Sequence, residues 1–318
     1  MNYAMPHPEA ILPSVVPPLH KATARVPGSS ANLGPGFDCL GLALDLYLRV
    51  ECQVTGGKLA IEVPDAQRAE IALNAENLVY RAMRLVFEAV HASVPGLHLS
   101  IDSGIPLSRG LGSSAAAIAA GLVLANALAG DPLDRHALLN LGIGLEGHPD
   151  NLAPALFGGL QVSSLVDGRA LTLPAEIKHP PRIVLFVPDF VMSTAEARRV
   201  LPERVSRADA VFNTGRAALL IAALAAGDLA ALRWAMEDRL HQPYRGAIFP
   251  ALPRLIEAAL HGGAAGAALS GAGSTVLAFC ERPEPVAAAM ASAAESLGLP
   301  GRSIEARIDF DGARVVPS

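Results

Sequence analysis

Cysteines, aromatic residues and long hydrophobic runs are all scarce in this sequence. Only three of the 318 residues are cysteines, at positions 39, 52 and 280, and their spacing forms no CxxC pattern. This argues against a disulfide framework and against a cysteine-ligated zinc site, and it favours a reducing compartment. Aromatic residues make up 4% of the chain, the formal net charge is −5, and no basic stripe is interleaved with aromatic residues. We therefore expect no nucleic-acid partner.

No segment reads as a membrane span. The most apolar segments, residues 115–129 and 217–226, are too short and too rich in alanine. The first twenty residues are rich in proline and lack the basic and apolar regions of a signal peptide. We expect residues 1–20 to form a flexible N-terminal extension. The protein should be cytoplasmic without a membrane partner, and a homodimer stays open.

Composition indicates a folded protein whose core is built from small residues. Hydrophobic residues account for 51% of the chain and charged residues for 17%, which excludes a disordered protein. A chain of 318 residues forms one large or two ordinary domains. Turn signals accumulate between residues 165 and 174, and we place a boundary there. The predicted domains are residues 21–170 and 171–318.

Hydrophobic periodicity predicts a mixture of strands and helices. The predicted strands are residues 22–26, 40–51, 58–63, 97–101, 182–188, 264–270, 275–280 and 303–309. The predicted helices are residues 77–87, 115–128, 134–145, 192–202, 206–226, 228–240, 250–261 and 283–297. Two polar stretches rich in glycine and proline, residues 27–38 and 146–160, are predicted as loops.

A glycine- and serine-rich loop, residues 104–117, joins a predicted strand to a predicted helix. Unpaired amides and the helix dipole favour an anion at such a helix N-terminus. Gly110 and Gly112 allow backbone amides to turn toward phosphate oxygens. Ser113 and Ser114 add hydroxyl groups, and Arg109 adds a positive charge. The loop therefore indicates a site for a nucleoside triphosphate.

Three other interpretations of this loop compete with phosphate binding. A Walker A loop requires Gly-Lys-Ser/Thr, and this stretch has no lysine. Residues 110–115 fit the loose dinucleotide pattern G-x-G-x-x-G/A, but they do not follow their strand at once. The nearest acid at the required distance, Asp131, lies in a predicted turn. Simple serine capping of the helix is the third alternative.

Both predicted polar loops carry candidate functional side chains. Residues 146–160 hold Glu146, which could bind Mg²⁺, together with His148, Asp150 and Asn151 as donors and acceptors for a small polar substrate. The alternative for each loop is a plain surface turn whose polar side chains satisfy local amides.

Three motifs in this order resemble the GHMP small-molecule kinases. They are an N-terminal substrate loop at residues 27–38, the glycine-serine phosphate loop at residues 106–116, and a late glycine turn at residues 270–274. The resemblance covers the chain from residue 22 to its end. It implies an α+β, two-domain GHMP kinase fold. In that fold an N-terminal ribosomal-protein-S5-like nucleotide domain precedes a C-terminal ferredoxin-like domain.

Two stretches narrow the resemblance to the homoserine kinase family. SSANLGPGFD at residues 29–38 is similar to that family's opening motif, and EGHPDNLAP at residues 146–154 is similar to its substrate loop. The segments TAEAR, residues 194–198, and PYRG, residues 243–246, also fit the family's patterns. The implied activity is ATP-dependent phosphorylation of L-homoserine to O-phospho-L-homoserine in threonine biosynthesis.

The resemblance also implies a role for individual residues. Substrate binding falls to Asn32, Asp38, His148, Asp150, Asn151, Thr194, Arg198 and Arg245, with the two arginines on the carboxylate. ATP binding falls to Pro106, Leu107, Ser108, Arg109, Gly110, Leu111, Gly112, Ser113, Ser114, Ala115, Gly271 and Gly273. Ser114 and Glu146 are the implied Mg²⁺ ligands, and Asp150, Asn151 and Arg198 are the implied catalytic residues. With the family in view, the glycine amides and Ser114 carry the phosphate interpretation, and Arg109 is free to face solvent.

The sequence departs from the family pattern at two points. The late turn reads Gly-Ala-Gly-Ser-Thr, without the proline that usually follows the second glycine. Several relatives have an aspartate base where Asn151 stands here, and an asparagine cannot accept a proton. One hypothesis is catalysis by positioning and charge stabilisation alone; the other makes Asp150 the base. A mevalonate- or sugar-kinase activity and a non-catalytic GHMP-fold binding protein are the alternative functions.

Overall fold

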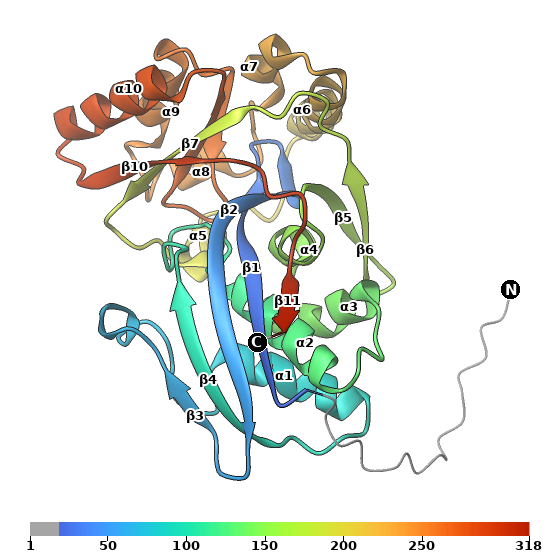
Figure 1. The fold of residues 1–318 in the computed structure, drawn as a ribbon. Helices are drawn as coiled ribbons and strands as arrows, with labels where there is room; N and C mark the ends of the chain where they lie inside the picture. Colours follow the sequence, from blue (N-terminus) through green and yellow to red (C-terminus); the bar gives the residue numbers. More distant parts are fainter. Residues whose placement is uncertain (1–18, 318) are drawn as a thin grey trace, which may run out of the picture.

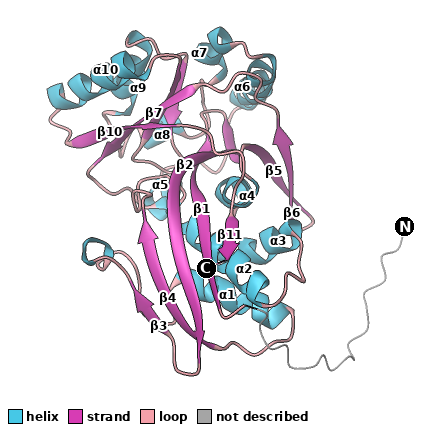
Figure 2. Cartoon of the chain, in the orientation of Figure 1, coloured by secondary structure: helices cyan, strands magenta, loops and turns pink. Residues whose placement is uncertain are grey.

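Two β-sheets organise the chain in the computed structural model, which describes residues 19–317 (Figures 1 and 2). The larger sheet has the strand order β11-β1-β2-β4-β3, and β5 pairs with both β2 and β6. Its strands are β1 (Lys21–Asn32), β2 (Gly36–Thr55), β3 (Ala60–Glu62), β4 (Gly96–Ser103), β5 (Leu160–Val166), β6 (Arg169–Ala175) and β11 (Arg314–Pro317). β3 runs parallel to β4, and the other pairings in this sheet are antiparallel.

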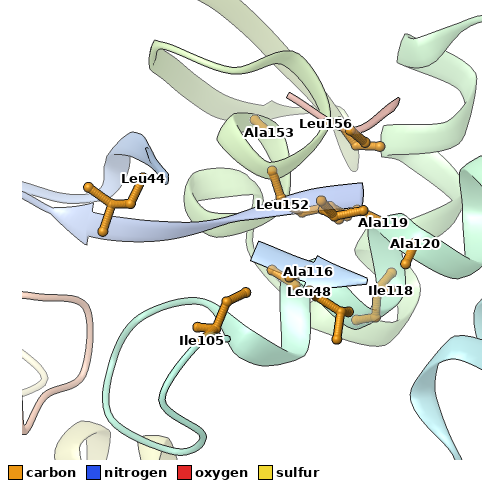
Figure 3. Packing of buried hydrophobic residues seen from close by; sticks show 14 of the residues in the cluster. Leu44, Leu48, Ile105, Ala116, Ile118, Ala119, Ala120, Leu152, Ala153 and Leu156 are labelled. Atoms are coloured by element: carbon orange, nitrogen blue, oxygen red, sulfur yellow. The ribbon is translucent and has the colours of Figure 1, made fainter. Parts of the chain in front are cut away.

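Four helices pack with the larger sheet and form the main core. They are α1 (Leu78–Ala89), α2 (Ser113–Leu128), α3 (Arg135–Glu146) and α4 (Pro149–Phe157). Helix α2 is buried over most of its length, because its alanines let α1, α3 and α4 approach closely. Figure 3 shows alanines of α2 packed near leucines of α4 and β2. This core holds the N-termini of α2 and α4 in place, and both termini carry candidate site residues.

The smaller sheet is antiparallel, with the order β10-β7-β9-β8. Its strands are β7 (Arg182–Pro188), β8 (Gly266–Leu269), β9 (Val276–Cys280) and β10 (Gly301–Ala306), and its long helices are α9 (Leu252–His261) and α10 (Pro283–Ser296). Between β7 and α9 lie α5 (Thr194–Arg199), α6 (Arg207–Ala226), α7 (Leu232–Ala235) and α8 (Gln242–Arg245). The four strands together with α9 and α10 follow, in the order β7-α9-β8-β9-α10-β10, the β-α-β-β-α-β arrangement of ferredoxin-like units. Two short 3₁₀ helices, η1 (Asp65–Gln67) and η2 (Leu229–Ala231), complete the described elements.

Most predicted elements are present, but both predicted polar loops are wrong. Strand β1 continues to Asn32 and β2 begins at Gly36, so residues 27–38 form two strands and a tight turn. Residues 149–157 form helix α4. Pro149 looks like a helix breaker in the sequence, yet it stands at the first helical position, where its missing N–H costs nothing.

Two further predictions need correction. The helix predicted at residues 228–240 is only η2 followed by one turn of α7, which ends at Ala235. The strand predicted at residues 303–309 is β10, and the final strand is β11. The turn signals at residues 165–174 belong to the β5–β6 hairpin, whose turn is Asp167-Gly168.

The predicted domain boundary at residues 170/171 stays a prediction. Strand β6 crosses that position and pairs with β5, and β11 returns to pair with β1 in the larger sheet. The predicted N-terminal extension, residues 1–20, lies outside the described residues except for its last two. Of these, His20 accepts a backbone hydrogen bond from Val54 through its carbonyl oxygen.

Helix α6 is the one described helix that is long and apolar enough to cross a membrane by length and composition. The sequence prediction considered only its second half. Only 22% of its most apolar window is buried. Its Asn213 is buried and donates to the Pro35 carbonyl and the Asp238 carboxylate, so this helix also makes polar contacts within the protein. Core helices of soluble proteins meet the same criterion, so it is weak evidence for a membrane span.

Candidate active site

A cavity of about 490 Å³ lies between Asn32 and Asp38 of the larger sheet and the turn between β8 and β9 that holds Gly271 and Gly273. Sixteen of the candidate residues line it: Asn32, Asp38, Ser108, Gly110, Gly112, Ser113, Ser114, Glu146, His148, Asp150, Asn151, Thr194, Arg198, Arg245, Gly271 and Gly273. Five others do not: Pro106, Leu107, Arg109, Leu111 and Ala115. The cavity therefore brings together segments that are spread over more than 200 positions of the sequence, from Asn32 to Gly273.

The phosphate-loop candidates surround the N-terminus of α2. Gly110 and Gly112 have φ angles of 73° and 67°, in the left-handed region that favours glycine. A Cβ at Gly112 would lie 2.0 Å from Ser29 Oγ, and one at Gly110 would lie 2.3 Å from the Ser270 carbonyl oxygen. The first helical bond runs from Ala116 N to Gly112 O, which leaves earlier amides of the turn available for an anion.

Serine capping, the third alternative for this loop, is not observed. The N-cap residue is Gly112, and it makes no side-chain capping bond. Ser114 instead donates to a carboxylate across the cavity. This arrangement is the one expected of an anion site rather than of a capped helix start.

Arg109 neither lines the cavity nor faces solvent freely. Its Nε donates to the Pro188 carbonyl at 3.0 Å, and its Nη2 donates to the Asp189 carbonyl at 2.7 Å. The suggestion of a solvent-facing side chain is therefore wrong, because Arg109 ties the loop to the end of β7. Leu111 and Ala115 are buried in the core and contribute no side chain to the cavity.

Ser114 and Glu146 form one wall of the cavity. Ser114 Oγ lies 3.1 Å from each carboxylate oxygen of Glu146. Burial raises the pKa of Glu146 to about 7, and the bond from Ser114 only partly opposes that shift. A cation would supply the missing positive charge. The described residues contain no cluster of three His, Cys, Asp or Glu. A hydroxyl and a carboxylate are oxygen donors of the kind that suit Mg²⁺ when phosphate and water oxygens complete its shell.

The N-terminus of α4 presents His148, Asp150 and Asn151 to the cavity. Asp150 is 3% exposed, and its Oδ1 has no hydrogen-bond partner among the described residues. His148 Nδ1 lies 3.8 Å from that oxygen. Burial raises the pKa of Asp150 to about 7, and the negative charges of Asp38 and Glu146 add to the rise. Asp150 is thus a buried carboxyl with one oxygen that accepts no hydrogen bond, and it can hold or accept a proton near neutral pH.

Close packing between α4 and β2 fixes the position of Asp150. Gly41 lies in β2 below the first turn of α4, and a Cβ there would fall 1.7 Å from the Asp150 carbonyl oxygen. Only a residue without a side chain allows this approach.

Asn151 is oriented by a residue that the sequence reasoning did not select. Ser29 Oγ donates to Asn151 Oδ1 at 2.9 Å, and Ser29 is fully buried. The bond leaves the Asn151 amide NH₂ as the free donor of that side chain. Ser29 belongs to the same motif as Asn32, but only its cross-chain contact distinguishes it from a structural serine.

Two arginines line the far side of the cavity. Arg198, from α5, pairs with Asp38 through two bonds of 2.7 and 3.1 Å, and this contact raises the pKa of Arg198. Arg245 is only 2% exposed. Burial and the neighbouring Arg198 charge lower the pKa of Arg245 to about 10. Both guanidinium carbons lie within 6 Å of the Phe37 ring centroid.

Asn32 links the β1–β2 hairpin to the late glycine turn. Its Nδ2 donates to the Gly271 carbonyl at 2.9 Å, and its Oδ1 accepts from the Asp38 amide at 3.0 Å. Gly271 N donates in turn to the Ala31 carbonyl. Both ends of the Asn32 amide are therefore committed to protein contacts, whereas Thr194, at the start of α5, faces the cavity.

Comparisons with known proteins agree with this geometry. The family model described as "GHMP kinases N terminal domain" matches residues 77–159, and "GHMP kinases C terminal" matches residues 220–297. Homoserine kinase from Microchaete diplosiphon is 43% identical over 296 residues, covering 92% of this chain and 96% of that protein. Homoserine kinase from Synechococcus sp. is 44% identical over 299 residues, covering 93% and 98%.

A solved structure shows the same fold. Homoserine kinase from Cytophaga hutchinsonii superposes with a TM-score of 0.85 at 24% identity, covering 98% of this chain and 100% of that one. The two-domain α+β prediction is confirmed. With both family models matched and relatives above 40% identity over nearly their whole length, this chain belongs to the homoserine kinase family of GHMP kinases.

Proposed function

We propose that this chain transfers the γ-phosphoryl group of ATP to the hydroxyl of L-homoserine, forming O-phospho-L-homoserine and ADP. One observation carries the proposal beyond family membership. A single cavity joins a glycine loop at a helix N-terminus to two arginines and three buried or half-buried carboxyls. One end of the cavity suits phosphates, and the other suits the charges of an amino acid.

The nucleotide phosphates bind at the start of α2 in this proposal. Gly110 and Gly112 line the cavity at this helix start, together with Ser108, Ser113 and Ser114. Ser114 and Glu146 would hold Mg²⁺ together with phosphate oxygens. The ion, when bound, neutralises charge that develops on the phosphates during transfer.

The amino-acid end of the site is built from paired charges. Arg198 and Arg245 bind the substrate carboxylate, and Asp38 binds the ammonium group. In the structure Asp38 and Arg198 pair with each other. A zwitterion can take over both partners at once, so neither charge is left buried and unpaired when homoserine binds. His148 and Thr194 complete the contacts around the substrate, together with Asn32, which keeps one amide N–H beyond its bonds to Gly271 and Asp38.

The catalytic group in this proposal is Asp150, Asn151 and Arg198. Asp150 accepts the hydroxyl proton as the oxygen attacks phosphorus in line, because its pKa of about 7 and its unpartnered oxygen suit a base. Asn151, held by Ser29, donates its amide NH₂ to an oxygen of the reacting groups. Arg198 fixes the substrate and contributes positive charge. The competing mechanism uses positioning and charge alone, with Asp150 only as a binding group.

Substrate identity is tested by a coupled ADP-release assay with homoserine, mevalonate and galactose offered separately. We expect ADP release with homoserine only. Release with mevalonate or galactose alone would support another GHMP kinase activity. No release with any of the three would support a non-catalytic binding protein. Cytoplasmic location and a homodimer stay predictions that this assay does not address.

A further inference from the structure

A fully buried histidine, His241, lies behind Arg245 and contacts it. His241 is 0% exposed and does not line the cavity. Its Nε2 lies 2.7 Å from the Gly34 carbonyl oxygen, and its Nδ1 lies 3.1 Å from Arg245 Nη1. We propose that His241, as the neutral imidazole protonated on Nε2, is the positioning residue that orients Arg245 for the substrate carboxylate; this rests on the proposed function.

The two hydrogen bonds determine the tautomer. A carbonyl oxygen only accepts, so Nε2 carries the proton. A guanidinium only donates, so Nδ1 must be unprotonated. The Asp238 carboxylate lies 3.5 Å from Nε2 and favours the same arrangement. A second proton on the ring would point at a cation, and burial lowers the pKa of His241 to about 4.

The surrounding contacts hold the imidazole ring rigidly. The ring stacks on Phe37 at 5.2 Å between centroids, with an angle of 22° between planes. Asp238 Oδ2 accepts from the His241 and Gln242 amides, which fixes the start of α8. The ring therefore has a fixed position relative to both the Gly34 turn and α8, the helix that carries Arg245.

Within residues 19–317, His241 supplies the one side-chain acceptor for Arg245. The other recorded acceptors are the carbonyls of Gly271 and Ala197. Nη2 has no hydrogen-bond partner within residues 19–317, and Arg245 lines the cavity. Three fixed acceptors on Nε and Nη1 aim Nη2 at the ligand. Without the imidazole, Nη1 would keep only Gly271, and the guanidinium plane could rotate.

Two isosteric substitutions separate the two bonds. His241→Asn places an amide oxygen near the position of Nδ1, so it keeps the acceptor for Arg245 and loses the donor to Gly34. His241→Gln places an amide NH₂ near the position of Nε2, so it keeps the donor and loses the acceptor. His98→Asn is the control, because His98 lies on β4 outside the cavity and pairs with Glu62.

The readout compares two ligands that differ only in the carboxylate. The KM for homoserine is measured beside the inhibition constant of 3-aminopropan-1-ol, which has the same hydroxyl and amine and no carboxylate. His241→Gln should raise the KM for homoserine about 10-fold or more, with less than about a 2-fold change in the inhibition constant. His241→Asn should raise the KM several-fold less than His241→Gln does. Parallel changes for both ligands, an equal KM for both variants, or an unchanged KM in His241→Gln would overturn the proposal.

The proposed function fails separately from this inference. If the wild-type protein releases no ADP with homoserine, the proposed function is wrong. If the wild-type protein is active and the variants behave like His98→Asn, only the role of His241 is wrong.

Discussion

Asp150→Asn should make the unliganded protein more stable while it makes the enzyme slower. The carboxyl is buried with one oxygen unpartnered, and its pKa is raised from 3.8 to about 7. A raised carboxyl pKa means that the folded protein binds this proton more tightly than the unfolded chain does. The asparagine side chain has the same shape and never becomes charged.

The size and direction of the effect follow from the pKa shift. Between pH 3.8 and about 7 the folded protein holds a proton that the unfolded chain has lost, so wild-type stability falls as pH rises through this window. Each pKa unit corresponds to about 1.4 kcal/mol. From pH 5 to pH 8 the wild-type protein should therefore lose about 3 kcal/mol from this carboxyl. Asp150→Asn should not lose this stability, so the difference in free energy of unfolding between the variant and the wild type should grow by about the same amount from pH 5 to pH 8.

Urea unfolding of both proteins at pH 5 and pH 8 measures the change, with Asp102→Asn as a control at an exposed strand position. If Asp150→Asn is no more stable than the wild type, or if the difference in their free energies of unfolding does not grow with pH, the raised pKa of Asp150 is refuted. The same variant decides between the two mechanisms. A kcat lowered by about 100-fold or more supports Asp150 as the base, whereas near-normal kcat with raised KM supports a binding role alone.

Three further substitutions test other parts of the site. Glu146→Gln should raise the Mg²⁺ concentration for half-maximal rate by about 10-fold or more; an unchanged Mg²⁺ dependence would remove Glu146 from the ion's ligands. Arg109→Ala should lower the free energy of unfolding by about 1–2 kcal/mol, because it loses bonds to carbonyls at the end of β7; a loss of ATP affinity at unchanged stability would instead indicate direct phosphate contact. Ser29→Ala should lower kcat about 5-fold with little change in KM, because the Asn151 amide is no longer held; a change confined to KM would contradict that role.

Local chemistry allowed the sequence to predict the glycine loop and the helix that follows it. Gly110 and Gly112 have left-handed φ angles, which favour glycine, and the alanine-rich segment after them is a strong helix former. Both features depend on neighbouring residues, so composition suffices. Helix α4 was missed for the opposite reason, because Pro149 signals a break unless its position at the helix start is already known.

Contacts between distant residues explain what the sequence could not reveal. Asp38 and Arg198 are 160 positions apart, and nothing local in either segment indicates that they pair. The same holds for Ser29 with Asn151, which are 122 positions apart. Family resemblance supplied roles for several of these residues but not their partners. The partners decide which side-chain atoms remain free for a ligand.

The hydrogen bonds to the Gly271 carbonyl hold cavity side chains in place and also connect the two halves of the chain. It accepts from Asn32 Nδ2 at 2.9 Å and from Arg245 Nη1 at 2.8 Å. Asn32 belongs to the larger sheet, whereas Arg245 and Gly271 lie in the half of the chain that carries the smaller one. A movement of the late glycine turn would therefore shift an arginine proposed to bind the substrate and loosen the hairpin that carries Asp38. Because Gly110 also packs against Ser270, the phosphate loop would move with them. The two ends of the cavity are thus mechanically coupled through one turn, so a substitution there should change the binding of both ATP and homoserine.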